Sequence, residues 1–209
     1  MAERTTGLRS LLTLPAAYEL FQQVVGSPNV RSEFIDNHVR PKKGDRLLDI
    51  GCGPGDILTY LPEVAYTGVD LNPRYISSAQ KKYGGRGTFS VAGVDDLVAD
   101  RLGTFDIVIA KSLLHHIDDT QVRRLFEMVT RILAPAGRLV TLDAGYAQGQ
   151  SALSRFVVGK DRGANVRADS HYVALAREWF DEVDVTVHHR LLRMPYTHVL
   201  LDCSSPRHA

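Results

Sequence analysis

Residues 49–55 read Asp-Ile-Gly-Cys-Gly-Pro-Gly, so three glycines alternate behind one acidic residue. Because glycine has no side chain, a ligand can approach the backbone of such a loop closely. A second carboxylate, Asp70, ends the next predicted strand, where it can accept hydrogen bonds from the two hydroxyl groups of a ribose. The loop and Asp70 together predict a site for an adenosine-containing ligand, whereas the loop alone would indicate only a strand-to-helix turn.

The spacing of the glycines discriminates between adenosine-containing ligands. Loops that bind dinucleotides read G-x-G-x-x-G and present a helix N-terminus to a pyrophosphate. The loop of this chain reads D-x-G-x-G-x-G instead. Its leading Asp49 would repel a diphosphate, but it can attract an ammonium group through water or a neighbouring amide. A ligand with adenosine at one end and a zwitterionic amino acid at the other fits better, and S-adenosylmethionine has this structure.

The elements that must position these residues alternate between strand and helix. The run from Phe105 to Ala110 is nearly all apolar, which is typical of a parallel strand covered on both faces. Asn72 followed by Pro73 predicts a helix start, and apolar residues spaced three and four apart predict an amphipathic helix after Asp118. The expected strands are 46–50, 65–70, 88–92, 105–110, 138–143, 183–192 and 196–203, and the expected helices are 56–61, 73–83, 119–133 and 170–180.

The last two strand-like runs are joined by the short connection 193–195, which predicts an antiparallel hairpin. Strand and helix alternation followed by this hairpin predicts a three-layer α/β fold with a mostly parallel sheet and one reversed strand. We expect one domain over residues 1–209, with a helical cap at 1–43. Residues 144–169 show little periodicity and are expected to form an insert or lid on the substrate side.

From about residue 44 to residue 143 the chain resembles the class I, Rossmann-like S-adenosylmethionine-dependent methyltransferases. The resemblance implies a seven-stranded sheet whose last strand is antiparallel, which agrees with the predicted hairpin. The matching motifs are Leu-Leu-Asp-Ile-Gly-Cys-Gly-Pro-Gly at 47–55, Gly-Val-Asp-Leu-Asn at 68–72, and Phe-Asp-Ile-Val-Ile-Ala at 105–110 with Leu-His-His-Ile at 114–117.

The same resemblance implies which residues hold the cofactor. The glycine loop would contact the methionine part, Asp70 the ribose and Leu71 the adenine. Relatives often carry Gly-Asp after the third strand to contact the adenine amino group, but here Val94 replaces the acid. Asp95, Asp96 or the backbone of Val94 and Asp95 must then serve, and we favour Asp95. The expected cofactor residues are Asp49, Gly51, Cys52, Gly53, Gly55, Asp70, Leu71, Asn72, Val94, Asp95 and Lys111.

Two histidines follow the fourth predicted strand, near the place where relatives hold the methyl group. Methyl transfer from a sulfonium needs alignment above all, which contributes up to roughly 7–11 kcal/mol, and a base only when the acceptor carries a proton. Histidine suits that role at neutral pH, and His115 is the preferred catalytic residue. His116 is expected either to contact the substrate or to link the loop and the following helix. Lys111 is expected at the cofactor rim or in solvent.

Residues outside the shared core must select the substrate. Tyr18, in the N-terminal segment, is expected to reach the acceptor or to pack in the core. The insert carries a basic cluster that includes Arg162 and Arg167, whose planar guanidinium groups suit a phosphate or carboxylate. The sequence therefore predicts a small-molecule acceptor with an anionic group, although a solvated basic surface would look the same.

The composition is that of an ordinary globular domain: 209 residues, 44% hydrophobic, 23% charged and a formal net charge of +1. A chain of this size can bury a sufficient core without metal or disulfides. Cys52 and Cys203 are far apart and lack metal-binding spacing, so we expect no metal site and a cytoplasmic protein. No apolar run approaches the ~18 residues of a membrane span, so no membrane partner is expected.

Three other functions compete with small-molecule methylation. A dehydrogenase requires a different glycine spacing. A nucleic-acid methyltransferase would be expected to carry a basic surface and a Pro-Pro-aromatic or Pro-Cys motif, which this chain lacks. A non-catalytic S-adenosylmethionine-binding protein on the same fold is the third alternative. Binding and transfer of labelled methyl groups would separate it from an enzyme.

Overall fold

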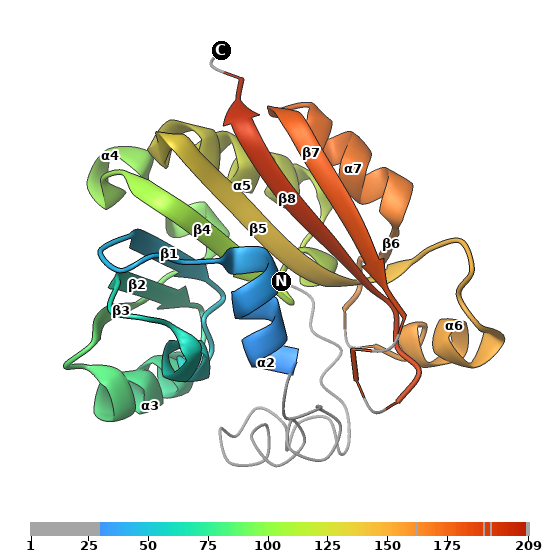
Figure 1. The fold of residues 1–209 in the computed structure, drawn as a ribbon, viewed down its shortest axis with the longest axis horizontal. Coiled ribbons are helices and arrows are strands. Elements are labelled where there is room, and N and C mark those ends of the chain that lie inside the picture. The colour runs from blue at the N-terminus through green and yellow to red at the C-terminus, as the bar shows by residue number, and fades with distance from the viewer. Residues whose placement is uncertain (1–29, 162, 190, 193, 208–209) are drawn as a thin grey trace.

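The computed structural model describes residues 30–161, 163–189, 191–192 and 194–207 of the chain (Figure 1). One sheet runs through it in the order β3-β2-β1-β4-β5-β8-β7, and the short β6 pairs with β5. Strand β8 is antiparallel to both of its neighbours, and the other pairs are parallel. The strands are β1 (Arg46–Ile50), β2 (Ala65–Asp70), β3 (Gly87–Val91), β4 (Phe105–Lys111), β5 (Leu133–Tyr146), β6 (Arg167–Ala168), β7 (Phe180–His188) and β8 (His198–Pro206).

Helices cover both faces of this sheet, as Figure 1 shows. Helices α5 and α7 pack on one face, and α2 with η2, η3 and α3 pack on the other. The predicted three-layer α/β fold with one reversed strand is therefore confirmed. The helical elements are α2 (Val30–Glu33), η2 (Phe34–Val39), η3 (Asp56–Tyr60), α3 (Pro73–Tyr83), η4 (Val94–Asp96), α4 (Ala99–Leu102), η5 (Leu114–His116), α5 (Asp119–Ile132), α6 (Ala152–Val158) and α7 (Asp169–Arg177).

Strand β4 lies at the centre and explains why its sequence is almost wholly apolar. Successive side chains of a strand point to opposite faces, so Val108 and Ala110 pack against α5 and α7 while Ile107 and Ile109 pack against the other layer. All four side chains are buried. Truncating a buried isoleucine to alanine costs about 2–5 kcal/mol, so both layers are anchored on this strand.

The predicted helix starts are also confirmed. The Asn72 side chain accepts a hydrogen bond from the Arg74 backbone N–H and caps α3, with Pro73 in the first turn. The Asp118 side chain accepts from the Gln121 N–H and caps α5. Each cap satisfies an N–H group that the helix itself leaves without a partner, which is worth about 1 kcal/mol.

Several predicted helix and strand boundaries after residue 130 were wrong. Leu133 does not belong to α5, because the helix ends at Ile132 and β5 begins immediately. Helix α7 begins at Asp169 rather than after a Ser170 cap, and it ends at Arg177. Strand β7 then starts three residues earlier than expected, because Phe180 is buried against α5 at its very beginning.

The predicted tight hairpin connection and the irregular insert also need correction. The connection between β7 and β8 spans residues 189–197 rather than three residues. The insert 144–169 is not irregular, since its first residues extend β5 and it contains α6 and β6. No described helix is long and apolar enough to cross a membrane.

Candidate active site

The turn between β1 and η3 has a backbone that glycine alone adopts easily. Gly51, Gly53 and Gly55 have φ values of 79°, 57° and 77°, which residues with a side chain rarely take. The N–H groups of Gly51 and Cys52 both donate to the Val69 carbonyl of β2, at 2.8 and 3.0 Å. A Cβ added to Gly53 would meet no atom of the described residues within 4 Å. Within the described part of the chain, the backbone there can be approached closely, as a ligand-binding loop requires.

Asp70 lies at the end of β2 and is tied to the same loop. One carboxylate oxygen accepts from the Gly53 N–H at 2.9 Å, and the other accepts from the Asn72 N–H at 2.8 Å. Two large apolar side chains stand beside it at the strand ends, Leu71 at 49% exposure and Val91 at 53%. A flat ring could cover them. The carboxylate and its apolar neighbours together suit a nucleoside.

Asp49 lies beneath this loop and is only 3% exposed. Burial raises the pKa of its carboxyl to about 6, although the hydrogen bond from the Tyr66 hydroxyl at 2.7 Å and the nearby Lys111 act in the opposite direction. The buried carboxylate can therefore act on an ammonium group of a ligand through its field rather than by direct contact. Lys111 is half-buried rather than exposed to solvent. Burial lowers the pKa of its ammonium group, while Asp49 and Asp143 raise it.

The loop after β3 does not support the favoured role of Asp95. Its carboxylate accepts hydrogen bonds from Gln121 and Arg124 of α5, both at 3.1 Å, so it is held on that helix. Asp96 is bound to the Gly93 N–H at 2.8 Å. Both carboxylates are thus engaged within the protein, whereas no such contact involves the Val94 side chain among the described residues.

His115 lies in η5, directly after β4, and is 4% exposed. Its Nδ1 is 2.7 Å from Oδ1 of Asp143, three residues before the end of β5, and the same oxygen accepts the His115 backbone N–H. Its Nε2 is 3.4 Å from Oδ1 of Asp161 in the insert. The ring of His116 stacks on it with a centroid separation of 4.1 Å. Two carboxylates therefore bracket one buried imidazole.

Asp161 is itself held in place by two donors. The Tyr196 hydroxyl donates to its Oδ2, and the Gly163 N–H donates to its Oδ1 at 2.7 Å. Burial alone would raise the pKa of the Asp161 carboxyl, but His115 and these hydrogen bonds lower it on balance. Asp161 is therefore a carboxylate facing the His115 ring.

The insert packs directly on η5. The Asn165 N–H donates to the His115 carbonyl at 3.0 Å. A Cβ added to Gly163 would lie 2.5 Å from that carbonyl oxygen, so only glycine permits the approach. Residues far apart in the sequence thus meet at His115.

Arg167 has a different role from the one predicted. It is 6% exposed, and its guanidinium group donates to Asp119 at 2.7 Å and to the carbonyls of Leu114 and Ile117 at 2.6 and 2.8 Å. Its donors are thus used to hold η5 and the start of α5 against β6, so it is not placed to bind an anionic substrate. Tyr18 and Arg162 lie outside the described residues.

A methyltransferase family model, described as "Methyltransferase domain", matches residues 47–137, which contain the glycine loop, Asp70 and His115. The chain is 30% identical over 115 residues to a ubiquinone biosynthesis O-methyltransferase of Xanthomonas axonopodis pv. citri, covering 53% of this chain and 47% of that protein. It is 34% identical over 119 residues to a juvenile hormone acid O-methyltransferase of Bombyx mori, covering 53% and 42%. The matches thus span about half the length of these curated relatives.

Solved structures share the fold. A phosphoethanolamine N-methyltransferase 2 of Haemonchus contortus in complex with S-adenosyl-L-methionine has a TM-score of 0.72 and 16% identity, covering 99% of this chain and 62% of that chain. An S-adenosylmethionine-dependent methyltransferase of Methanosarcina mazei has a TM-score of 0.63 and 21% identity, covering 82% and 98%. Residues 47–137 therefore match a methyltransferase domain, and the described fold is one that S-adenosylmethionine-dependent methyltransferases share.

The observed residues of this methyltransferase domain fit its cofactor. The Gly53 backbone, which no other described residue crowds, supplies a cradle, the half-buried Asp70 carboxylate a ribose acceptor, and the exposed Leu71 an apolar platform. Leu113 of the segment before His115 lies 3.5 Å from the position of a Cβ on Gly51, so the glycine loop and the histidine loop adjoin. A ligand in the loop would therefore lie next to the histidine segment.

Three residues of the methyltransferase site were missed from the sequence. Asp143 ends a predicted strand beside β4, so the rule that neighbouring parallel strands end at one edge could have found it. Asp161 was taken as part of a basic cluster, and Tyr196 as a strand residue. They reach His115 only through the path of the insert and the hairpin, for which the sequence carries no local signal.

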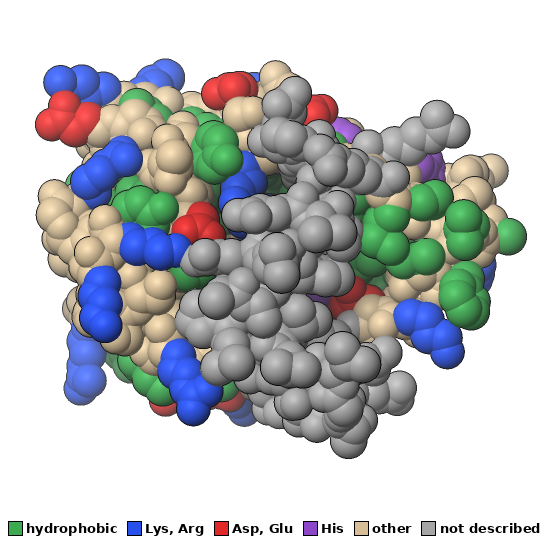
Figure 2. Space-filling model, turned by 90° about the horizontal axis from the view of Figure 1, so that it is seen from below, with side chains coloured by type: hydrophobic (Ala, Val, Ile, Leu, Met, Phe, Trp, Pro, Cys, Tyr) green, Lys and Arg blue, Asp and Glu red, His purple; other side chains and the backbone are tan. Residues whose placement is uncertain are grey.

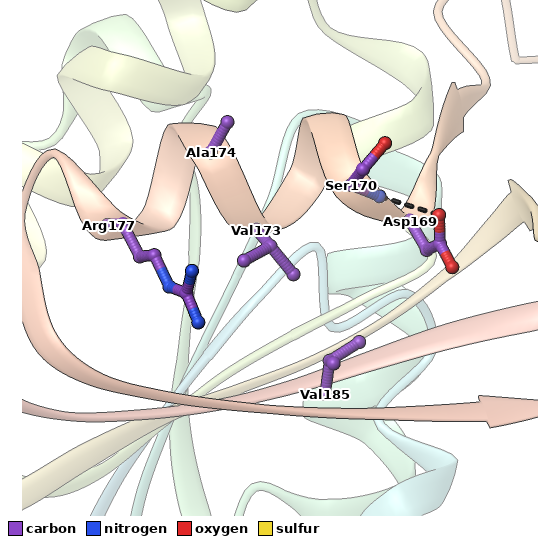
Figure 3. Close-up of a pocket in the computed structure, with 6 residues that line it drawn as sticks. All are labelled: Asp169, Ser170, Val173, Ala174, Arg177 and Val185. Carbon is purple, nitrogen blue, oxygen red and sulfur yellow. Dashed lines mark hydrogen bonds between the residues drawn. The ribbon is translucent and has the colours of Figure 1, made fainter.

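A shallow pocket of about 290 Å³ lies elsewhere, between α7 and β7 (Figure 3). It contains none of the strand-end residues described above and no histidine. Its position on the edge of the sheet separates it from the methyltransferase site. The lining residues are Asp169, Ser170, Val173, Ala174, Arg177 and Val185.

Proposed function

We propose that this chain transfers the methyl group of S-adenosylmethionine to a small-molecule acceptor. The observation that carries the proposal is the buried pair of His115 and Asp143 near the ends of β4 and β5, adjoining the glycine loop. The relatives support it, since they are named as methyltransferases in ubiquinone biosynthesis, of juvenile hormone acid and of phosphoethanolamine. The formal net charge of +1 gives no reason to prefer nucleic acid.

The cofactor is assigned to the residues predicted from the sequence, with one change. The backbone from Gly51 to Gly55, including Cys52, would hold the methionine part, and Asp70 with Asn72 the ribose. The backbone of Val94 and Asp95 replaces the Asp95 carboxylate. When bound, S-adenosylmethionine supplies a methyl group on a sulfonium sulfur, whose bond to that carbon breaks with the electron pair remaining on sulfur. The protein then has to align the acceptor and exclude water.

Removal of the acceptor's proton depends, in this proposal, on His115. An ionised Asp143 carboxylate can accept hydrogen bonds but cannot donate them. The short contact therefore assigns the imidazole proton to Nδ1 of His115. Nε2 is then the ring atom left to take up the acceptor's proton, and the imidazolium so formed would lie 3.4 Å from the Asp161 carboxylate. A positioned histidine contributes typically ~10²–10⁴-fold to such a reaction. His115 is therefore proposed as the catalytic residue, and His116 as its neighbour on the acceptor side.

The electrostatics beside His115 indicate the reacting group of the acceptor. Asp143 and Asp161 flank the ring, and the Arg167 guanidinium is occupied by Asp119 and backbone carbonyls. An anionic group at this point would be repelled, whereas a hydroxyl or amine can donate a hydrogen bond. An anionic group elsewhere on the acceptor would rest on Arg162, so Arg162→Ala should raise the acceptor KM more than that of the cofactor.

The insert is proposed to cover the acceptor. It contacts His115 through Asn165 and Gly163, and α6 exposes Leu153 at 57% and Phe156 at 63%. Figure 2 shows hydrophobic side chains gathered on the side where Figure 1 places α6. A short helix with exposed apolar side chains, beside the reacting residues, is suited to closing over an organic substrate.

The test is transfer of radiolabelled methyl groups from S-adenosylmethionine into a panel of small hydroxylated and amine metabolites. The wild-type chain should label at least one acceptor, and His115→Ala should reduce the rate by ~10²–10⁴-fold with cofactor affinity retained. His171→Ala is a matched control, because His171 also pairs with an aspartate, Asp119, but is exposed and makes no recorded contact with His115 or Asp161. Binding of the cofactor without labelling of any acceptor would support a non-catalytic protein instead.

A further inference from the structure

We propose that His115, His116 and Asp161 bind one divalent transition-metal ion, with zinc as the reference ion. The sequence predicted no metal site because its two cysteines are far apart. The fold instead brings two imidazoles and one carboxylate together from η5 and the insert. The inference rests on the proposed function and states how His115 would assist removal of the acceptor's proton.

The distances among the ligand atoms suit such an ion. One atom from each of His115, His116 and Asp161 lies within 4.8 Å of the others. In a tetrahedral zinc site with bonds of ~2.0–2.1 Å, neighbouring ligand atoms stand about 3.3 Å apart. The separation of His115 Nε2 from Asp161 Oδ1 is 3.4 Å, so this edge already has the required length. The ring nitrogen of His116 would need to move by at most about 1.5 Å to complete the site.

The surroundings of the ligands support the same assignment. A histidine that binds a metal usually donates its other ring N–H to a carboxylate, which fixes the tautomer and the ring orientation. Asp143 does this for His115 at 2.7 Å. The Tyr196 hydroxyl and the Gly163 N–H fix the Asp161 carboxylate in the same way. Both ligand side chains are thus preorganised by partners that leave Nε2 and Oδ1 facing each other.

The negative charge around His115 independently favours a bound cation. Asp143 is 1% exposed, and its Oδ2 has no hydrogen-bond partner among the described residues. A buried carboxylate oxygen without a partner is costly unless a positive charge compensates it. The charges of Asp143 and Asp49 both act on Lys111, so this ammonium group is shared between two buried carboxylates. With Asp161, the site holds two carboxylates around one imidazole ring, which favours a cation.

The donor set indicates the class of ion. Imidazole ligands suit zinc, iron, nickel and copper, whereas magnesium and calcium prefer oxygen ligands. Three protein ligands leave one position open, as in catalytic rather than structural zinc sites. The site is therefore of the kind that binds a substrate oxygen.

With the ion bound, the acceptor's hydroxyl oxygen would take the open position. The ion lowers the pKa of the bound hydroxyl, as it does for water, and the released proton passes to solvent water. The oxygen lone pair then forms the new bond to carbon as the carbon–sulfur bond breaks, which leaves a neutral thioether and a methyl ether. His115 acts in this step as a ligand, so its Nε2 need not carry the proton itself.

The test uses the full chain after removal of metals by a chelator. Zn²⁺ is titrated calorimetrically, and Co²⁺ is titrated by its visible absorption, which reports the coordination number. The wild-type protein should bind one ion per chain at this site. His116→Ala and Asp161→Asn should each weaken that binding by at least about 100-fold while S-adenosylhomocysteine affinity is kept. His171→Ala is the matched control and should bind the ion as the wild type does.

Two results would overturn the inference: a wild-type chain that binds no stoichiometric Zn²⁺ or Co²⁺, or an ion whose affinity is the same in both ligand variants. The first would indicate that His115 is shared as an imidazolium between Asp143 and Asp161. Undiminished methyl transfer by the chelated protein would refute the role of the ion but leave the methyltransferase proposal intact. An ion lost from both variants in a chain that labels no acceptor would uphold the metal site and refute the proposed function.

Discussion

Replacing Asp49 by asparagine should stabilise the protein at neutral pH, although Asp49 lies in the glycine-loop motif. Its carboxyl is 3% exposed and accepts a hydrogen bond from the Tyr66 hydroxyl, which an asparagine oxygen can also accept. Asparagine therefore preserves the shape and the hydrogen bond while removing the buried charge. The change isolates the free energy of ionising this group inside the fold.

The magnitude follows from the pKa, which burial raises from 3.8 to about 6. Because the pKa of the Asp49 carboxyl is higher in the folded than in the unfolded chain, its contribution to the free energy of unfolding is fully present below about pH 3.8. That contribution is lost as the pH rises through 6. Since one pKa unit corresponds to 1.36 kcal/mol, the ionised group costs about 3 kcal/mol above pH 7. Asp49→Asn should recover up to that amount at pH 8 and about half of it at pH 5.

Urea denaturation of both proteins at pH 8 and pH 5 measures this difference. For a chain of this size, a gain of about 3 kcal/mol raises Tm by roughly 6–12 °C. Asp184→Asn, at an exposed position of β7, is the control and should change stability little at either pH. An Asp49→Asn variant that is no more stable than the wild type at pH 8, or whose gain does not depend on pH, would refute the reasoning. The variant should also bind S-adenosylmethionine more weakly, because the charge beneath the loop is gone.

Two further substitutions test the contacts around His115. Gly163→Ala should lower kcat for methyl transfer at least tenfold without changing cofactor affinity, because its Cβ would collide with the His115 carbonyl. Steady-state kinetics measures kcat, and calorimetry measures the cofactor affinity. An unchanged kcat would mean that the insert does not position His115. Arg167→Ala should destabilise the fold by about 2–4 kcal/mol, because it leaves the buried carbonyls of Leu114 and Ile117 without their donor. Thermal unfolding measures this loss, and a change in acceptor KM at unaltered stability would restore the predicted role in anion binding.

The sequence predicted the sheet well because its elements are encoded locally. Strand β4 is apolar because both faces are covered, and the start of α3 is marked by Asn72 and Pro73, so neither depends on distant residues. The boundary between α7 and β7 was wrong because Phe180 is buried against α5, and this tertiary contact ends the helix early. Local patterns cannot register a contact with a helix fifty residues away.

The same difference between local patterns and tertiary contacts explains which residues of the candidate site were predicted. The glycine loop and Asp70 lie on consecutive elements, so their spacing alone indicated a nucleoside site. Arg167 was misread because a guanidinium in a loop looks the same whether it faces solvent or is saturated by buried carbonyls. Asp161 was missed for the converse reason, since its meaning depends on the insert folding back onto His115.

The central claim is that the crevice at the ends of β1 and β2 binds S-adenosylmethionine through Asp70. Calorimetric titration of S-adenosylhomocysteine into the wild type, Asp70→Asn and Asp70→Ala tests it most directly. One molecule should bind per wild-type chain, and both variants should bind at least about tenfold more weakly, since a hydrogen bond to a charged group is worth about 1.5–3 kcal/mol. Absence of binding to the wild type, or equal affinity in folded Asp70 variants, would contradict the account.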